Sequence, residues 1–271
     1  RTPLVPAALP APPPAAPVLR VALLADAHLP DANEKTGAAR RLLAAVEAIN
    51  TLEPPVELAF YLGDLSDQGR FEALELGKEI LGSLRPPFWL LPGDGDLPAR
   101  ARWAQLFAPG HFSFTHHGWH FLGLDTTVLN PFTRQPEFQV SPEHRAWLAE
   151  ELARLAPTAP LVIFSHGPLY RLFQPWHWWT REAEVLHDLL AGRDKVFFFN
   201  GHVHQNIALE HRNLVFQGVR ATAWPGPDVR LGSRGGSMDS RTMPGRQGCG
   251  WMLLTCQSGG ELSLADMVWE A

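Results

Sequence analysis

The sequence predicts an α/β fold in which two sheets pack face to face with helices on their outer sides. Continuous apolar runs alternate with amphipathic segments, a pattern typical of strands buried on both faces and connected by helices. Pairs of short strand-like runs follow, as in hairpins. The chain has 271 residues, of which 45% are hydrophobic, enough for one large core. We therefore expect a single domain over residues 18–271.

Each predicted element rests on its local pattern. Strands are predicted at residues 18–25, 56–62, 87–91, 112–116, 119–124, 161–164, 196–199, 207–210, 214–217, 250–255 and 262–268. Helices are predicted at residues 36–52, 71–84, 97–107, 141–155 and 182–190. Leu42, Val46 and Ile49 stand at helical spacing in the first helix. Ser141 and Pro142 give the fourth helix an N-cap and a proline in its first turn.

The N-terminal residues 1–17 are rich in proline and alanine, so we expect them to form an extended tether. They resemble the spacer left after processing of an exported protein, and we interpret the chain as periplasmic or otherwise extracytoplasmic. No apolar run reaches transmembrane length. The net charge is −5, so electrostatic attraction does not favour a nucleic acid as partner. Cys249 and Cys256 are expected on opposite faces of one strand, buried and reduced.

Five short segments carry acidic or histidine side chains where a buried strand is expected to end. They are Asp26-Ala27-His28, Gly63-Asp64-Leu65-Ser66-Asp67, Gly93-Asp94-Gly95-Asp96, Ser165-His166 and Gly201-His202-Val203-His204. Catalytic residues gather at the carboxyl ends of strands in α/β sheets, so these segments are expected along one sheet edge. Each segment alone has an ordinary explanation, such as a turn or a buried histidine with a partner. Together and in this order they predict a site for two metal ions.

The five segments resemble the motifs of the calcineurin-like metallophosphoesterase superfamily: D-x-H, G-D-x-x-D, G-N-H-[D/E], an isolated H and G-H-x-H. The resemblance extends over residues 18–220. It implies a four-layer α/β/β/α sandwich of two mixed sheets flanked by helices, with two transition-metal ions (Mn, Fe, Zn or Co). It assigns one metal to Asp26, His28, Asp64 and His204, and the other to Asp64, Asp94, His166 and His202. Asp64 then bridges the metals, a hydroxide between them attacks phosphorus, and Asp67 lies behind the ligands.

The third motif departs from the family pattern, because it has G-D-G-D in place of G-N-H-D. Asp94 replaces an asparagine ligand and adds a negative charge, which favours a trivalent ion such as Fe(III). Gly95 replaces the histidine that stabilises phosphate and helps to protonate the leaving group, and losing a positioned acid costs about 10²–10⁴-fold in rate. Asp96 resembles the acid that orients this histidine, and is predicted as catalytic together with Asp64.

Three interpretations of Gly95 stay open. The substrate has a leaving group that needs no acid, as in a phosphoanhydride. Alternatively, another side chain supplies the proton, with His116, His117, His177 and Arg171 as candidates. In the third interpretation the protein binds metal and hydrolyses little.

Two further segments attract attention. Gln174-Pro175-Trp176-His177-Trp178-Trp179 is expected to be a lid or substrate wall, a hydrophobic plug, or a patch that binds a protein partner. Residues 225–248 form a long loop whose Arg230, Arg234, Arg241 and Arg246 either grip phosphate or are simply solvated.

The sequence thus predicts a metal-dependent phosphoesterase, with reduced activity because of Gly95, that hydrolyses a phosphodiester or phosphoanhydride. The expected substrate is a phosphorylated small molecule or a lipid-linked one. The competing prediction is a metal-binding pseudoenzyme that serves as an interaction module in a cell-envelope assembly. A protein phosphatase is disfavoured, because its alkoxide leaving groups need the missing acid.

Overall fold

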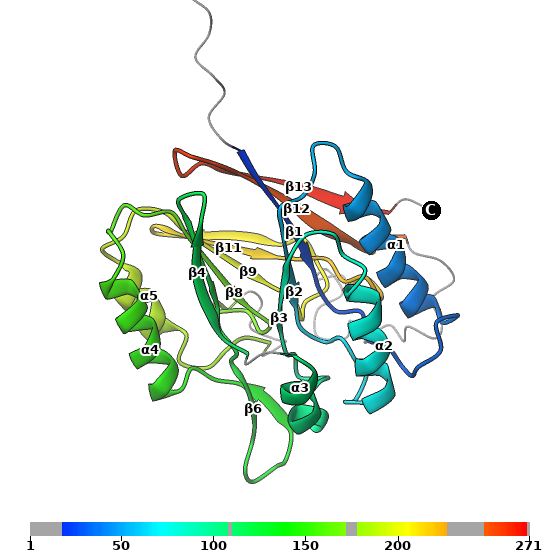
Figure 1. Cartoon of the computed structure of the whole chain (residues 1–271). Helices are drawn as coiled ribbons and strands as arrows, with labels where there is room; N and C mark the ends of the chain where they lie inside the picture. The colour runs from blue at the N-terminus through cyan, green and yellow to red at the C-terminus, as the bar shows by residue number, and fades with distance from the viewer. Residues whose placement is uncertain (1–17, 108–109, 172–177, 227–246, 270–271) are drawn as a thin grey trace, which may run out of the picture.

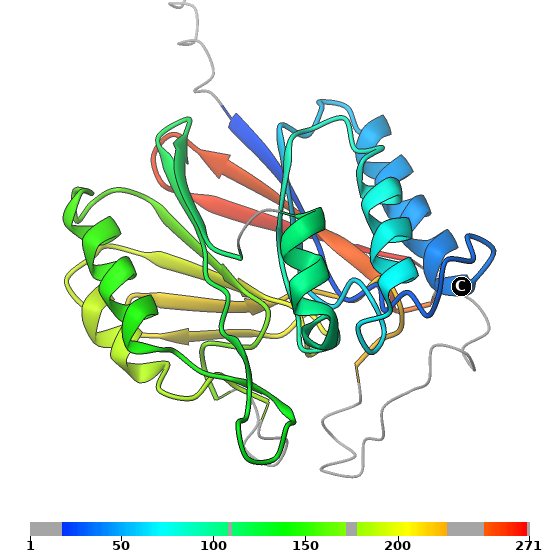
Figure 2. The same cartoon turned by 60° about the horizontal axis from the view of Figure 1, so that its bottom comes forward.

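The computed structural model describes residues 18–107, 110–171, 178–226 and 247–269, and the predicted tether at 1–17 lies outside them. Two large sheets face each other, and helices cover the outer side of each (Figure 1). This arrangement confirms the predicted α/β sandwich with its four layers. Viewed after a 60° turn, helices flank the paired sheets on both sides (Figure 2).

The first sheet contains five strands in the order β13-β12-β1-β2-β3. Its strands are β1 (Val18–Leu24), β2 (Leu58–Leu62), β3 (Phe88–Leu91), β12 (Gly250–Gln257) and β13 (Leu262–Val268). β1, β2 and β3 run parallel to one another. β12 runs antiparallel to both of its neighbours, β1 and β13. Helices α1 (Gly37–Thr51) and α2 (Phe71–Leu81) cover its outer face.

The second sheet contains six strands in the order β10-β11-β9-β8-β5-β4. Its strands are β4 (Phe112–His116), β5 (Trp119–Gly123), β8 (Leu161–Ser165), β9 (Val196–Asn200), β10 (Ala208–His211) and β11 (Leu214–Gly218). β5, β8, β9 and β11 are parallel. Helices α4 (Pro142–Ala153) and α5 (Glu184–Leu190) pack on its outer side.

The core between the sheets is largely aromatic. Phe60 of β2 is fully buried, and its ring centroid lies 4.2 Å from that of Phe164 in β8 and 5.4 Å from that of Phe121 in β5. The next residue on the strand, Tyr61, packs on the opposite face among residues of the helix layer. Both faces of β2 are therefore buried, which explains why its sequence is continuously apolar.

Several element ends differ from the sequence-based prediction. α2 ends at Leu81 and not at Leu84, with Gly82 as its C-cap. The predicted helix at 97–107 is divided into the 3₁₀ turn Leu97–Ala99 and α3 (Arg100–Leu106). α5 begins at Glu184, two residues after its predicted start. Ser141 is the N-cap of α4 as predicted, because its side chain accepts a hydrogen bond from the backbone of His144.

One hairpin was absent from the sequence-based prediction: β6 (Thr127–Leu129) pairs with β7 (Pro136–Phe138). Its strands have three residues each, too short for a period-two pattern to stand out. The Asn130 side chain stabilises the connecting turn by accepting hydrogen bonds from the backbone of Phe132 and Thr133. The hairpin matters because β7 reaches the functional site.

Cys249 and Cys256 are both buried and free, as predicted, but only Cys256 lies in β12, because that strand begins at Gly250. Cys256 belongs to the core between the sheets. In the described parts of the chain, no helix combines the length and apolar character needed to cross a membrane.

The aromatic core allows a direct test of what holds the sheets together. Phe60→Ala is expected to lower the free energy of unfolding by about 3–5 kcal/mol, because a fully buried phenyl ring leaves a cavity between two sheets. Urea denaturation followed by circular dichroism measures this change. Phe132→Ala is the matched control, since that ring is 92% exposed and its loss should change stability by no more than about 0.5 kcal/mol. Similar midpoints for both variants would contradict the packing described here.

Candidate metal centre

The five motif segments all follow the carboxyl ends of parallel strands. Asp26 comes two residues after β1, Asp64 two after β2, and Asp94 three after β3. His166 and His202 likewise follow β8 and β9 of the other sheet. The first three segments thus come from one sheet and the last two from the other. The side chains meet because the carboxyl ends of both sheets lie at the same end of the sandwich.

The backbone at this edge is unusual. Asp26, His28, Asp64, His202 and His204 all have positive φ, between 44° and 63°. Non-glycine residues rarely adopt this conformation, and it concentrates at functional sites. Backbone hydrogen bonds stabilise it, since the N–H of Asp26 donates to Gly63 O (2.9 Å) and that of His28 donates to Asp64 O (3.0 Å). No sequence pattern indicated this strain.

The candidate ligand atoms form two groups. One group contains Asp26, His28 and His204. The other contains Asp64, Asp94, His166 and His202. Within each group, one ligand atom of each residue lies within 4.8 Å of those of the other members. The structure thus brings the sequence-predicted ligands together, with Asp64 grouped with Asp94, His166 and His202, whereas the resemblance assigns Asp64 to both metals. Asp64 lies between the groups, because its Oδ2 is 3.3 Å from His28 Nε2 and its Oδ1 is 3.5 Å from His166 Nε2.

Hydrogen bonds to the backbone fix the orientation of two imidazoles. His166 Nδ1 lies 2.6 Å from Leu62 O, and His204 Nδ1 lies 2.9 Å from Trp224 O. A carbonyl oxygen only accepts, so each Nδ1 carries the proton and donates it. Each Nε2 then faces the carboxylates of the cluster, and after losing its proton it would be the atom that binds a metal, as in metal-binding histidines. The mixed nitrogen and oxygen donor set fits a transition metal such as Mn, Fe, Zn or Co.

Charge pairing shifts the pKa values of the cluster. Burial alone would raise the pKa of Asp94, but the neighbouring His202 and His166 hold it well below its ordinary value. Burial likewise opposes ionisation of His166, yet the nearby Asp64 and Asp94 raise its pKa well above the usual range. For His28, burial is the largest effect and its pKa is lowered. The carboxylates and imidazoles therefore stabilise each other's charge where cations would be held.

The Asp96 carboxylate is completely buried and faces the backbone. It accepts hydrogen bonds from the N–H of Leu65 (3.1 Å), the N–H and hydroxyl of Ser66 (2.8 and 3.1 Å) and the N–H of Gly93 (3.0 Å). Burial and the charge of Asp64 raise its pKa to about 7, against the lowering effect of the three backbone donors. Asp96 thus joins the loop after β2 to the loop after β3.

Gly95 is packed against the candidate bridging residue. Its N–H donates to Asp64 Oδ1 at 2.6 Å. A Cβ at this position would lie 2.9 Å from Ser66 O and 3.0 Å from Asp64 Oδ1. The space next to Asp64 is therefore tight on this side, and the backbone of residue 95 contacts the same carboxylate.

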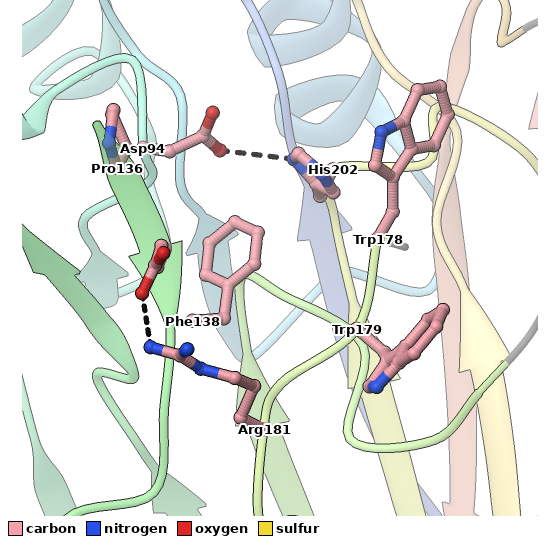
Figure 3. A pocket seen from close by; sticks show the side chains of 8 residues that line it. Asp94, Pro136, Phe138, Trp178, Trp179, Arg181 and His202 are labelled. Atoms are coloured by element: carbon pink, nitrogen blue, oxygen red, sulfur yellow. Dashed lines mark hydrogen bonds and ion pairs between the residues drawn. The ribbon is translucent and has the colours of Figure 1, made fainter. Parts of the chain in front are cut away.

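Two adjoining pockets open onto the cluster. One, of about 340 Å³, is lined by Asp94, Pro136, Glu137, Phe138, Trp178, Trp179, Arg181 and His202. The other, of about 150 Å³, is lined by His28, Asp64, Asp94, Trp178, His202, Val203, His204, Trp224 and Gly226. Figure 3 shows Phe138, Trp178 and His202 around the first pocket, with Arg181 at its side. Arg181 forms an ion pair with Glu137.

Aromatic rings therefore border the cluster on several sides. Phe138 lies edge-on to His202 with centroids 4.7 Å apart, and Trp224 lies 4.4 Å from His28. Trp178 and Trp179 belong to the predicted tryptophan-rich segment, whereas its residues 174–177 lie outside the described part of the chain. Phe138 belongs to the hairpin that the sequence did not predict, and Trp224 had no motif around it.

Of the proposed substitutes for the missing histidine, His116 and His117 lie away from the site, whereas Arg171 lies over the ring of Trp179, which lines the larger pocket. His116 and His117 lie at the turn between β4 and β5, at the amino end of parallel strand β5 and hence at the opposite end of the sheet. Arg171 lies 3.3 Å from Glu184 at the start of α5, and it does not line either pocket. His177 and the four loop arginines lie outside the described residues. The prediction that His116 or His117 acts as the acid is therefore wrong.

Comparisons with known proteins found related sequences and a similar fold. A 3',5'-cyclic-nucleotide phosphodiesterase of Nostoc sp. is 26% identical over 187 residues, which is 67% of this chain and 68% of that protein. A probable glycerophosphodiester phosphodiesterase of Arcobacter nitrofigilis is 25% identical over 202 residues, 70% of this chain and 69% of that protein. A dimetal phosphatase from Danio rerio shares the fold, with a TM-score of 0.65 and 14% identity over 93% of this chain and 100% of that chain.

A family profile described as calcineurin-like phosphoesterase matches residues 19–206. The match begins in β1 and ends just after His204, so it contains every strand end that contributes to the metal centre. Because this region covers more than half of the chain, the protein belongs to the calcineurin-like phosphoesterase family.

Proposed function

We propose that the protein is a metal-dependent phosphoesterase that holds two transition-metal ions and hydrolyses a phosphodiester or phosphoanhydride bearing an aromatic group. The observation that carries this proposal is the division of the donor atoms into two groups with Asp64 between them. Two bound cations would supply Lewis-acid stabilisation of developing charge and lower the pKa of a water nucleophile.

The residues of the chain have distinct roles in this proposal. Asp26, His28 and His204 hold one cation, and Asp94, His166 and His202 hold the other, with Asp64 shared. Asp96 is a positioning residue, because its carboxylate fixes the loop that carries Asp64 and touches only backbone and Ser66 donors. The three cluster carboxylates offset most of the charge of two divalent ions, so a trivalent ion such as Fe(III) fits one position.

The aromatic walls support a substrate that carries a planar group. Trp178 borders both pockets, and the larger pocket extends from Asp94 and His202 toward Phe138 and Trp179. A phosphate at the cluster would place its organic substituent against these rings. Nucleobases stack on aromatic side chains, so a nucleotide diester or anhydride suits this pocket better than a glycerophosphodiester.

The second candidate function is a metal-binding module without appreciable turnover. The environment of Gly95 favours it, because the position of the family's histidine is crowded by Ser66 O and Asp64 Oδ1 and offers no side-chain acid. The two functions differ in one measurable property: the module binds metal and the enzyme also turns over phosphodiesters. The assays below separate them.

Asp64→Asn tests the shared ligand. We expect turnover of bis-p-nitrophenyl phosphate to fall by about 10²–10³-fold or more, as when one electrostatic stabiliser is removed, together with a loss of bound metal. Elemental analysis of the assayed sample gives both values. Asp194→Asn, an exposed aspartate ahead of β9, is the matched control and should change neither. Bound metal without turnover in the unmodified protein would support the module instead.

Gly95→Ala tests the close contact beside Asp64. The added methyl group meets Ser66 O and Asp64 Oδ1 at about the closest distance that atoms tolerate, so Asp64 or its loop must move. We expect about 10²-fold lower kcat, the effect of a displacement near 1 Å at a reacting centre. Gly192→Ala is the control, because a Cβ there meets nothing within 4 Å. Equal activity of both variants would show that the contact is unimportant.

Trp178→Ala tests the proposed substrate wall. Loss of a stacking partner worth about 1–3 kcal/mol should raise KM for a 3',5'-cyclic nucleotide by about 5- to 150-fold with kcat little changed. A glycerophosphodiester, which has no ring to stack, should show no such increase. Leu43→Ala on the exposed side of α1 controls for a general loss of apolar surface. An equal KM increase for both substrates would refute the stacking role.

A further inference from the structure

A second group of metal-ligating side chains lies away from the centre described above. It contains Glu57, His116 and His117, with one ligand atom from each within 4.8 Å of the others. Glu57 immediately precedes β2, whereas His116 ends β4 and His117 begins the turn to β5. The group is therefore at the amino end of the parallel strands, and the candidate catalytic centre is at their carboxyl end.

The geometry directs two consecutive histidines to one oxygen atom. Glu57 Oε2 lies 3.3 Å from His117 Nε2 and 3.7 Å from His116 Nε2. Successive side chains of a strand point in opposite directions, so two neighbours normally diverge. Here His117 has a φ of 46°, which turns its ring back until the two imidazoles are perpendicular, with centroids 4.4 Å apart. The positive φ belongs to the two-residue turn His117-Gly118, where both residues have positive φ as in a type I′ hairpin, and this turn brings both rings to the same carboxylate.

The separations fit ligands of one ion better than hydrogen-bonding partners. A good N–H···O hydrogen bond measures about 2.7–3.2 Å, and both contacts are longer. In a tetrahedral zinc site with bonds of about 2.0–2.1 Å, neighbouring ligand atoms are about 3.3–3.4 Å apart. The 3.3 Å between His117 Nε2 and Glu57 Oε2 matches this value, whereas the 3.7 Å from His116 Nε2 is longer. Two imidazoles and a carboxylate are also a donor set that zinc sites use.

We propose that Glu57, His116 and His117 form a binding site for a transition-metal ion of the Zn²⁺ type. The three side chains are between 37% and 42% exposed, so a fourth position is open to solvent and the ion can exchange. Glu57 is attached to the first sheet, where its N–H donates to Arg20 O (2.9 Å). The histidines belong to the β4–β5 hairpin of the second sheet. A bound ion therefore joins the two sheets at the end opposite the catalytic centre.

The site predicts a specific loss of zinc binding. The protein is stripped with a chelator, equilibrated with free Zn²⁺, and its bound zinc and Tm are measured together. We expect His117→Asn and Glu57→Gln each to bind about one Zn²⁺ fewer per chain than the unmodified protein. Asparagine tolerates positive φ, so the first variant should keep the turn. At about 100 times the Kd of this site, Zn²⁺ should raise the Tm of the unmodified protein about 5–10 °C more than that of either variant.

Two controls separate this site from the catalytic centre. His211→Asn removes a histidine from the corresponding hairpin position at the end of β10 and should leave the zinc content unchanged. Turnover of bis-p-nitrophenyl phosphate should be the same in all four proteins, because none of these changes touches the other cluster. Equal zinc content in the unmodified protein, His117→Asn and Glu57→Gln would overturn the proposal. Zinc lost together with turnover would also overturn it, since the ion would then belong to the catalytic centre.

Discussion

The candidate ligands themselves join the two sheets at the functional end of the molecule. Asp26, which follows a strand of the first sheet, accepts the N–H of His202, which follows a strand of the second, at 3.1 Å to each carboxylate oxygen. In the same direction, His166, which follows a strand of the second sheet, donates to the carbonyl of Leu62 in the first. These contacts require that the strand ends of the two sheets keep a fixed relative position. The aromatic core around Phe60 fixes that position, so the packing between the sheets and the geometry of the centre depend on each other.

The sequence predicted the parts of this protein that depend on side-chain type and order. Continuous apolar runs predict the buried strands, and the position directly after such a run predicts Asp26, Asp64 and His202 as site residues. The left-handed backbone at these residues could not be predicted, because it results from hydrogen bonds between loops of different strands. The packing of Trp224 against His28 has the same origin, since the preceding Thr222 and Ala223 donate backbone hydrogen bonds to Ala25 and Asp26, at the end of the first strand.

Asp96 and Gly95 illustrate how a motif can be recognised and its parts still be misassigned. Resemblance alone describes Asp96 as an acid that has lost its histidine, whereas in the structure its carboxylate receives four hydrogen bonds from neighbouring loops. Gly95 is not simply a gap either, because its N–H donates to the same Asp64 that links the two ligand groups. A burial and hydrogen-bonding pattern of this kind depends on distances between loops, which spacing along the chain does not specify.

The position of two tryptophans gives the metal centre an optical property. The indole of Trp224 lies 4.4 Å from the ring of His28, and that of Trp178 lies 5.7 Å from the ring of His202. A cation bound by these histidines would be the largest local charge near either indole. The emission of these two residues, among ten tryptophans in the chain, would therefore change when the candidate centre binds a cation. The aromatic walls of the two pockets would thus make the protein an intrinsic fluorescent reporter of metal bound there.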